Sequence, residues 1–204
     1  MMRARPGSAG YLVAQRRRRP LSNRKPVRTM PSLTIDAAST ALVLIDLQRG
    51  IAGMQTTPHV ASDVVARAVQ LANRFRERSA LVVLVHVDPG PKGILFPRTL
   101  TDVPRPVPDY PPDWTRIVPE LGPRDGDVVV TKHHPCAFHA TDLDLQLRRR
   151  AVRTVVLGGI STNVGVEATA RAGYELGYDI VFVEDAMAAR EADLHTFSIT
   201  RFFP

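Results

Sequence analysis

Five short apolar runs from residue 40 onward constrain the fold of this protein more than any other feature of its sequence. They span residues 41–46, 81–87, 127–132, 154–158 and 179–184. Each run is strand-sized, consists mostly of Val, Ile and Leu, and does not alternate with polar residues, as expected when both faces of a strand are buried. Helical patterns separate the runs. This alternation predicts a parallel sheet whose strands are joined by crossover helices.

The segments between the runs carry helix signals. Apolar side chains in the first of them form one stripe, with arginines on the other side. Thr141 can cap the second helix, and Gly177 can end the third. The predicted helices span residues 62–78, 141–150, 162–176 and 191–203. We therefore predict a three-layer α/β/α fold, with a doubly wound parallel sheet of five to six strands.

The first 33 residues differ from the rest in composition. Of the 27 basic residues in this 204-residue chain, nine lie within residues 1–30, which hold no acidic residue. Subtracting these nine from 27 leaves 18 basic against 20 acidic side chains in the rest of the chain. The overall charge of +7 therefore comes from the first 30 residues and is no evidence of a basic face on the folded part. We expect residues 1–33 to be a disordered basic extension, residues 34–204 to form one domain, and no nucleic-acid partner.

Three explanations of this extension stay open. In the first, the start codon is assigned too early and Met30 opens the protein. In the second, the segment is a solvated basic arm, and in the third it serves targeting or nucleic-acid attachment. In the folded part, residues 88–119 hold nine of the 17 prolines and break the alternation. This segment is either a lid or binding loop, or a polyproline-like strap on the surface.

Cysteine content and hydropathy limit the class of protein. Cys136 is the single cysteine, which excludes a disulfide framework and a multi-cysteine zinc site and favours a reducing compartment, the cytoplasm. No run approaches the ~18 consecutive apolar residues of a membrane span, so we expect no membrane partner.

Polar residues follow several of the predicted strands. In an open parallel α/β sheet, ligands bind at the carboxyl ends of the strands. Asp46 ends the first strand, Lys132 ends the third, and residues 159–163 lead from the fourth strand into a helix. Burial raises the pKa of such an aspartate unless a cation lies nearby, and Lys132 is the candidate cation. Alternatively, Asp46 caps a turn and Lys132 points to solvent.

Three stretches carry a resemblance to a known family: TALVLIDLQRGI, TKHHPCAFHATDLDLQLRRRAVRTVVLGGISTNVGVEATARAGYELGY and VFVEDAMAA. They resemble isochorismatase-like hydrolases, also called cysteine hydrolases, over nearly everything from Thr34 onward. The resemblance implies a three-layer fold, a homo-oligomer, and an Asp, Lys and Cys triad. Asp46 and Lys132 match the first two members, but Gly165 stands at the cysteine position.

This departure decides the chemistry that the resemblance implies. Without a thiol at position 165, covalent acyl-enzyme chemistry lacks its nucleophile. The family's true isochorismatases also lack the cysteine and hydrolyse a vinyl ether with the aspartate as acid. We expect a hydrolase that uses Asp46 and Lys132 for acid/base chemistry on a vinyl ether or C–N bond. The small-molecule substrate would contact Ile160, Ser161, Thr162, Asn163 and Phe138, with a cis peptide at Ile160–Ser161.

Alternatives stay open beside this hypothesis. One alternative is a non-catalytic relative that binds a small ligand or serves as an oligomer subunit. Another is an amidase that uses Cys136 as its nucleophile. Gly165 leaves space for a ligand, or reflects relaxed selection after loss of activity. The resemblance also implies an edge strand after the Phe-Pro segment; its absence means a truncated chain or an edge that a partner covers.

We expect neither a metal nor another cofactor. His133, His134 and His139 fit no standard ligand spacing, and the Asp-x-His element of metal-bearing relatives is missing near His86. The glycines near residue 160 form neither G-x-G-x-x-G nor a P-loop, so no nucleotide site is predicted.

Overall fold

A five-stranded parallel sheet forms the centre of the domain. The computed structural model describes residues 34–96, 102, 108 and 110–203. The predicted extension 1–33 and the middle of the proline-rich segment lie outside these residues. The strands have the order β3-β2-β1-β4-β5, and every neighbouring pair is parallel. They are β1 (Thr40–Ile45), β2 (Leu81–Val87), β3 (Val128–Lys132), β4 (Thr154–Ile160) and β5 (Asp179–Ala188). All five predicted strands are confirmed.

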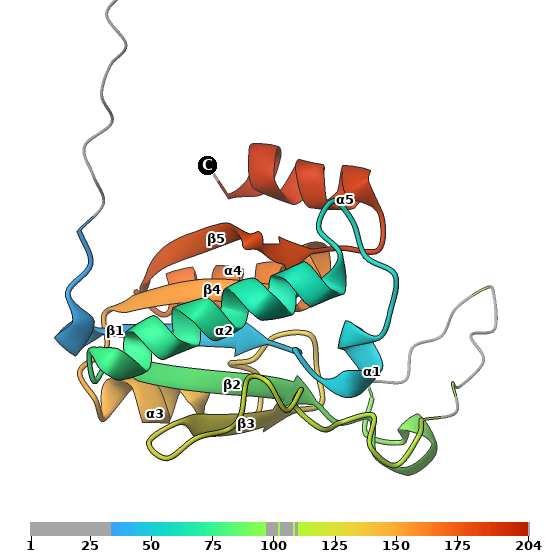
Figure 1. The fold of residues 1–204 in the computed structure, drawn as a ribbon, viewed down its shortest axis with the longest axis horizontal. Helices are drawn as coiled ribbons and strands as arrows, with labels where there is room; N and C mark the ends of the chain where they lie inside the picture. Colours follow the sequence, from blue (N-terminus) through green and yellow to red (C-terminus); the bar gives the residue numbers. More distant parts are fainter. Residues whose placement is uncertain (1–33, 97–101, 103–107, 109, 204) are drawn as a thin grey trace, which may run out of the picture. The chain divides into compact units, whose positions relative to one another are not determined.

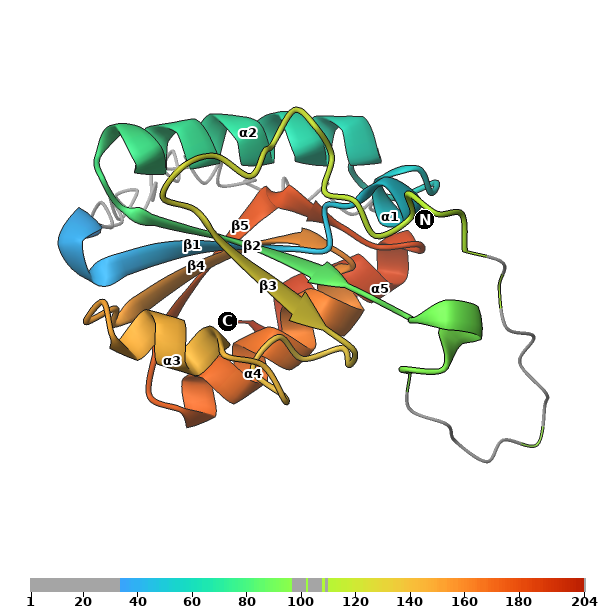
Figure 2. The same cartoon turned by 90° about the horizontal axis from the view of Figure 1, so that it is seen from below.

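Helices cover both faces of the sheet (Figures 1 and 2). The long helix α2 lies on one face, and α3 and α4 lie on the other, so the predicted three-layer, doubly wound architecture is confirmed. The α-helices are α1 (Arg49–Ala52), α2 (Ala61–Glu77), α3 (Leu143–Arg148), α4 (Glu167–Glu175) and α5 (Ala192–Phe197). Short 3₁₀ turns cover Ala37–Ser39 and Pro91–Gly93, and π-helical turns cover Thr162–Val166 and Ser198–Phe202.

The central strand β1 divides the core in two. All six of its residues are buried. Leu42 and Leu44 pack with α2, whereas Val43 and Ile45 pack with residues of α3 and α4. Complete burial of one such side chain contributes roughly 1.5–3 kcal/mol, so two opposed cores anchor this strand and fix the position of the residue that follows it.

Strands β4 and β5 are longer than the sequence indicates. Strand β4 continues to Ile160, because Gly159 adopts φ +127°, and an added Cβ there would collide with the carbonyl oxygen of Ile45. Only glycine lets β4 pass β1 this closely. Strand β5 continues to Ala188 across an irregularity in its pairing with β4 at Leu157 and Gly159.

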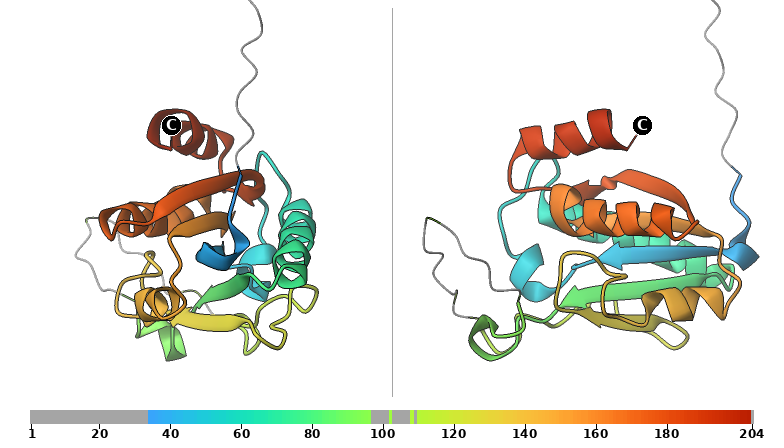
Figure 3. Two further views of the ribbon diagram at one scale, coloured as in Figure 1. Left: turned by 90° about the vertical axis from the view of Figure 1, so that its left-hand side faces the viewer. Right: turned by 180° about the vertical axis from the view of Figure 1, so that it is seen from behind.

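The C-terminal segment lies beyond the outer strand. In both views of Figure 3, α5 and the turn after it lie on the far side of β5 from β4. Phe203 stacks on Phe182 of β5, with ring centroids 3.7 Å apart. Among the described residues, no helix combines the length and apolar character needed to cross a membrane.

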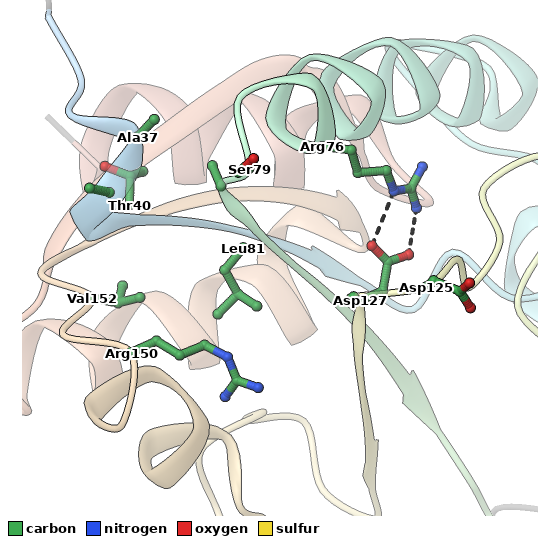
Figure 4. A pocket seen from close by; sticks show the side chains of 12 residues that line it. Ala37, Thr40, Arg76, Ser79, Leu81, Asp125, Asp127, Arg150 and Val152 are labelled. Carbon is green, nitrogen blue, oxygen red and sulfur yellow. Dashed lines mark hydrogen bonds and ion pairs between the residues drawn. The ribbon is translucent and has the colours of Figure 1, made fainter.

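A pocket at the amino ends of the strands contains a buried ion pair (Figure 4). Arg76 of α2 holds Asp127 through two contacts, of 2.6 and 3.1 Å, and also donates to the carbonyl of Leu121. Asp127 accepts a further bond from the backbone N–H of Arg124. Because the hydrogen bonds of this carboxylate are satisfied within the protein, the pair anchors the loop that precedes β3 and does not offer a free catalytic group.

Candidate active site

Asp46 lies at the point where the strand order reverses. It follows β1 directly, and β4 and β2 flank that strand on either side, so the residue lies at the topological switch point of the sheet. Its backbone N–H donates to the carbonyl of Val85 at 2.9 Å, and its φ is +55°. A left-handed conformation is uncommon for a residue other than glycine and occurs often at functional sites. This bend turns Asp46 out of the strand direction.

Lys132 forms a buried ion pair with Asp46. It is the last residue of β3, and its Nζ lies 2.8 Å from Asp46 Oδ2. The same ammonium donates to the carbonyl of Pro135 at 2.8 Å, and the lysine side chain is only 2% exposed. The expected proximity of Asp46 and Lys132 is therefore confirmed, and the alternative of a solvent-directed lysine is wrong. The catalytic role of the pair stays a prediction.

The environment of Asp46 favours its protonated form. Burial raises the pKa of this carboxyl to about 6, and the charge and hydrogen bond of Lys132 oppose this rise. Asp46 Oδ1 is buried and has no hydrogen-bond partner among the described residues. A carboxyl of this kind can exchange a proton near neutral pH, and no group among the described residues competes for a proton on Oδ1.

Gly165 lies beside this pair, in the π-helical turn before α4. A Cβ added to it would lie 3.2 Å from Asp46 Oδ2 and 3.4 Å from Lys132 Nζ, so the matched position belongs to the site. The same Cβ would lie 2.8 Å from Cγ2 of Ile45, closer than carbon atoms approach without displacement. Ile45 thus fills part of the space that the missing side chain leaves, and close packing is a third reason for glycine at this position.

The turn between β4 and Gly165 contains a cis peptide and a buried threonine that contacts α5. Its Ile160–Ser161 peptide is cis, as the resemblance implies. Ile160 is buried in the core on the α2 side, and Ser161 and Asn163 are half-buried. Thr162 is fully buried, and its Oγ1 lies 2.8 Å from Nδ1 of His195 in α5. The Thr162 hydroxyl is therefore engaged by α5.

The ring of Phe138 contacts α4 and Tyr178. It packs against Gly173 of α4, where an added Cβ would lie 3.1 Å from Cε2, and stacks on Tyr178 with centroids 5.7 Å apart. The substrate contact expected of Phe138 stays a prediction.

The residues around Cys136 form a separate surface. Cys136 is half-buried, and its Sγ accepts a hydrogen bond from the N–H of Phe138. His134 and His139 stand edge to face with ring centroids 4.4 Å apart, and they line a pocket with Cys136 along α4. No described interaction joins Cys136 to Asp46.

Two features of this region were not predicted from the sequence. The fully buried Gln48 accepts from Val87 N–H at 2.7 Å, and it donates to the carbonyls of Val87 and Trp114. It thereby ties the segment around Trp114 to the ends of β1 and β2. Gln48 lies two positions after Asp46, which directly follows β1, and a polar residue at this place was the signal in the sequence from which its role could have been predicted. The second feature is a cluster around His195, which includes His59, a residue too distant in the sequence to be linked to it by spacing.

In this protein an Asp and a Lys meet at the carboxyl edge of a doubly wound parallel sheet, near a turn with a cis peptide. This combination defines a class of small α/β enzymes. The isochorismatase domain model matches residues 40–204, and the chain belongs to the isochorismatase family.

Three relatives illustrate its place in that family. The chain is 44% identical to YecD of Escherichia coli O157:H7, an uncharacterized isochorismatase family protein, over 84% of this chain and 92% of that protein. An isochorismatase family protein from Burkholderia thailandensis is similar in structure, with a TM-score of 0.79, 46% identity, and coverage of 84% of this chain and 90% of that one. N-carbamoylsarcosine amidase from Thermoplasma acidophilum matches with a TM-score of 0.63 and 28% identity, over 80% of this chain and 92% of that chain.

Proposed function

We propose that this protein hydrolyses a small organic molecule by acid/base chemistry at Asp46, assisted by Lys132, without a cysteine nucleophile and without a cofactor. One observation carries the proposal: Asp46 is buried with a pKa of about 6, and its Oδ1 lacks a partner among the described residues. A buried carboxyl that titrates near neutrality and has a free oxygen is suited to proton transfer. The family includes hydrolases, and this function fits among them.

For a vinyl ether, protonated Asp46 supplies the proton that starts the reaction. The proton passes to the terminal alkene carbon, and an oxocarbenium ion forms at the carbon that bears the ether oxygen. Water adds to that carbon, and its proton returns to Asp46. The resulting hemiketal loses the alcohol and leaves a ketone. Lys132, with Nζ 2.8 Å from Asp46 Oδ2, stabilises the carboxylate that exists between the two proton transfers.

For a C–N bond, the same carboxyl works in the opposite protonation state. Ionised Asp46 accepts a proton from a water molecule, which attacks the carbonyl carbon, and the proton then passes to the leaving nitrogen. The structural similarity to N-carbamoylsarcosine amidase supports this bond class. The two reactions have opposite pH dependences.

The test is turnover of a panel of vinyl ethers, amides and carbamoyl compounds. We expect activity in the wild type and at least about a 100-fold loss in Asp46→Asn, the usual scale of a lost acid/base group. Asp125→Asn serves as the matched control, since Asp125 is exposed at the opposite end of the sheet (Figure 4) and should leave activity unchanged. Full activity in Asp46→Asn would end the acid/base proposal, provided that circular dichroism shows both variants folded.

A non-catalytic role is the second candidate, because Ile45 occupies part of the space beside Gly165. A protein of this kind would bind a small molecule at the same edge without turning it over. Wild-type protein that shifts its melting temperature with members of the panel, but hydrolyses none of them, would support this function over the first.

Two further expectations accompany the proposal. We propose a homo-oligomer and a cytoplasmic location, the first from the family resemblance and the second from the single cysteine, Cys136. Light scattering on the purified protein measures the oligomeric state directly.

A further inference from the structure

Two histidines and a glutamate meet at the edge of the domain beyond β5. His59 lies in the connection between α1 and α2, Glu184 on β5, and His195 on α5. In Figures 1 and 3, the connection between α1 and α2 runs beside the loop from β5 to α5, and Thr57 pairs with Ala189 across this junction. The connection before α2 therefore meets β5 and α5, more than a hundred residues later in the chain, and each of the three segments presents one polar side chain to a common point.

The three side chains direct ligand atoms at one another. Glu184 Oε1 lies 3.0 Å from Nε2 of His59 and 3.0 Å from Nε2 of His195. All ligand atoms of the cluster lie within 4.8 Å of each other. Bonds of about 2.0–2.1 Å around a tetrahedral ion place ligand atoms roughly 3.3 Å apart, so the present spacing needs only small side-chain movements to accept an ion.

The inner histidine is already held in the orientation of a metal ligand. His195 is 3% exposed, and its Nδ1 lies 2.8 Å from the hydroxyl of the fully buried Thr162. Because a carboxylate only accepts, Nε2–H donates to Glu184 Oε1 in the ion-free site. A bound ion would replace this proton at Nε2, and Nδ1–H would then donate to Thr162 Oγ1. Metal-bound histidines commonly have their second ring nitrogen fixed in this way, which sets the tautomer and the ring angle. The burial of His195 and its contact with Thr162 distinguish this cluster from a chance surface group.

The outer ligands leave the site open to solution. The side chains of His59 and Glu184 are 32% and 48% exposed, so an ion can enter and retain water in its remaining positions. One carboxylate and two neutral imidazoles suit zinc and neighbouring divalent transition ions better than calcium or magnesium, which prefer oxygen-only sites.

We propose that His59, Glu184 and His195 form a binding site for one divalent transition-metal ion, with zinc as the representative ion. The site would join the connection before α2, β5 and α5, and through Thr162 it would hold the turn that leads to Gly165. This proposal departs from the sequence-based expectation of no metal, which concerned the histidines around Cys136 and the neighbourhood of His86. It does not depend on the proposed hydrolase function.

Zinc titration of tag-free, metal-stripped full-length protein tests the site. We expect about one zinc ion per chain by calorimetry and a rise in melting temperature when zinc is present. Glu184→Gln and His59→Gln alter partly exposed side chains and should each weaken zinc binding at least about tenfold. His139→Gln is the matched control, because it disrupts the His134 and His139 pair near Cys136 and should leave affinity unchanged.

A separate variant examines the link to the turn. Thr162→Val keeps the shape of the side chain but removes the hydroxyl beside His195 Nδ1, and we expect affinity to fall about 10- to 100-fold. The proposal is overturned if the wild type binds no zinc at micromolar concentrations, or if Glu184→Gln and His59→Gln bind as tightly as the wild type. In either case the three residues form only a hydrogen-bonded network centred on Glu184.

Discussion

Asp46 combines three features in one residue. It adopts a left-handed backbone conformation, it is buried against a lysine, and its pKa is raised to about 6. Burial alone would favour the neutral acid, whereas the charge and hydrogen bond of Lys132 stabilise the carboxylate and partly offset the effect of burial. Both protonation states are therefore accessible near neutral pH, which a residue that must give up and recover a proton requires.

The pH dependence of kcat/KM separates the two proposed reactions. If Asp46 acts as an acid on a vinyl ether, kcat/KM should be level below about pH 6 and fall roughly tenfold per pH unit above it. If Asp46 acts as a base in C–N hydrolysis, kcat/KM should rise up to about pH 6 and then level off. Steady-state kinetics from about pH 4.5 to about pH 8.5 measures the profile. A profile without an inflection near pH 6 would contradict the assignment of Asp46 in both reactions.

Gly165→Cys should place a reactive thiol at the site. Its sulfur would start from a Cβ 3.4 Å from Lys132 Nζ, and a neighbouring ammonium stabilises a thiolate. In a Cys136→Ser background, we expect the new thiol to react with iodoacetamide with an apparent pKa clearly below the ~8.5 of a free thiol, and faster than Cys136 in the wild type.

The same substitution also introduces a clash with Ile45. Overpacking of this kind costs about 1–3 kcal/mol, and Gly165→Ala carries the same added Cβ without the thiol. Comparing the two variants by denaturant unfolding separates the clash from the chemistry. A thiol in folded Gly165→Cys that titrates like free cysteine would mean that position 165 is wrongly matched to the family nucleophile.

Residues that end strands were predictable from the sequence, whereas the contacts of Thr162 and Phe138 were not. The positions of Asp46 and Lys132 follow from where buried strands end, so their proximity was predictable. Thr162 and Phe138 were assigned to the substrate by resemblance, yet one bonds to His195 and the other packs on Gly173. Their side-chain directions depend on α5 and α4, whose packing no local pattern specifies.

At the scale of elements, the loop before β3 depends on one buried ion pair. Arg76 and Asp127 have side chains only 14% and 2% exposed, and their contact is 2.6 Å. We expect Asp127→Ala to lower the free energy of unfolding by about 3–5 kcal/mol, because it leaves the arginine charge without its partner. The pair lies at the opposite end of the sheet from Asp46, so kcat of the folded fraction should stay unchanged.

An exposed ion pair on the same helix provides the control for this prediction. Arg74 and Glu77 are 75% and 60% exposed and lie 3.1 Å apart, so Glu77→Ala should cost less than about 1 kcal/mol. Urea unfolding of both variants gives the comparison. Equal losses in the two variants would show that burial adds nothing to the Arg76 and Asp127 interaction.

The ends of helices and strands were predicted correctly where one local sequence signal was strong. Helix α2 agrees with its prediction to within one residue at each end, because its apolar stripe is unambiguous, and Gly177 follows α4 with φ +86° as its capping role requires. Strand β4 was predicted two residues short, because two glycines lower the apparent strand tendency of its end. Its true length depends on the close approach of Gly159 to Ile45, a tertiary contact.

At the scale of the whole molecule, we expect the net positive charge and the folding stability to come from different parts of the chain. The nine basic residues within residues 1–30 account for the net positive charge, and the rest of the chain has a slight acidic excess. The same 30 residues show no periodic apolar pattern that would contribute to a core. Removing residues 1–29 should therefore change the charge of the protein greatly and its stability very little.

Two measurements on the shortened chain test this separation. We expect the melting temperature to change by less than a few degrees, because terminal segments without buried contacts contribute little to stability. We also expect any weak binding of the full chain to duplex DNA at low salt to be lost with residues 1–29, since such binding follows the number of basic side chains that contact phosphate and weakens as salt increases. A larger fall in melting temperature would show that the extension packs on the domain. DNA binding that survives the deletion would mean that the nearly neutral domain has a basic face of its own, which contradicts the expectation of no nucleic-acid partner.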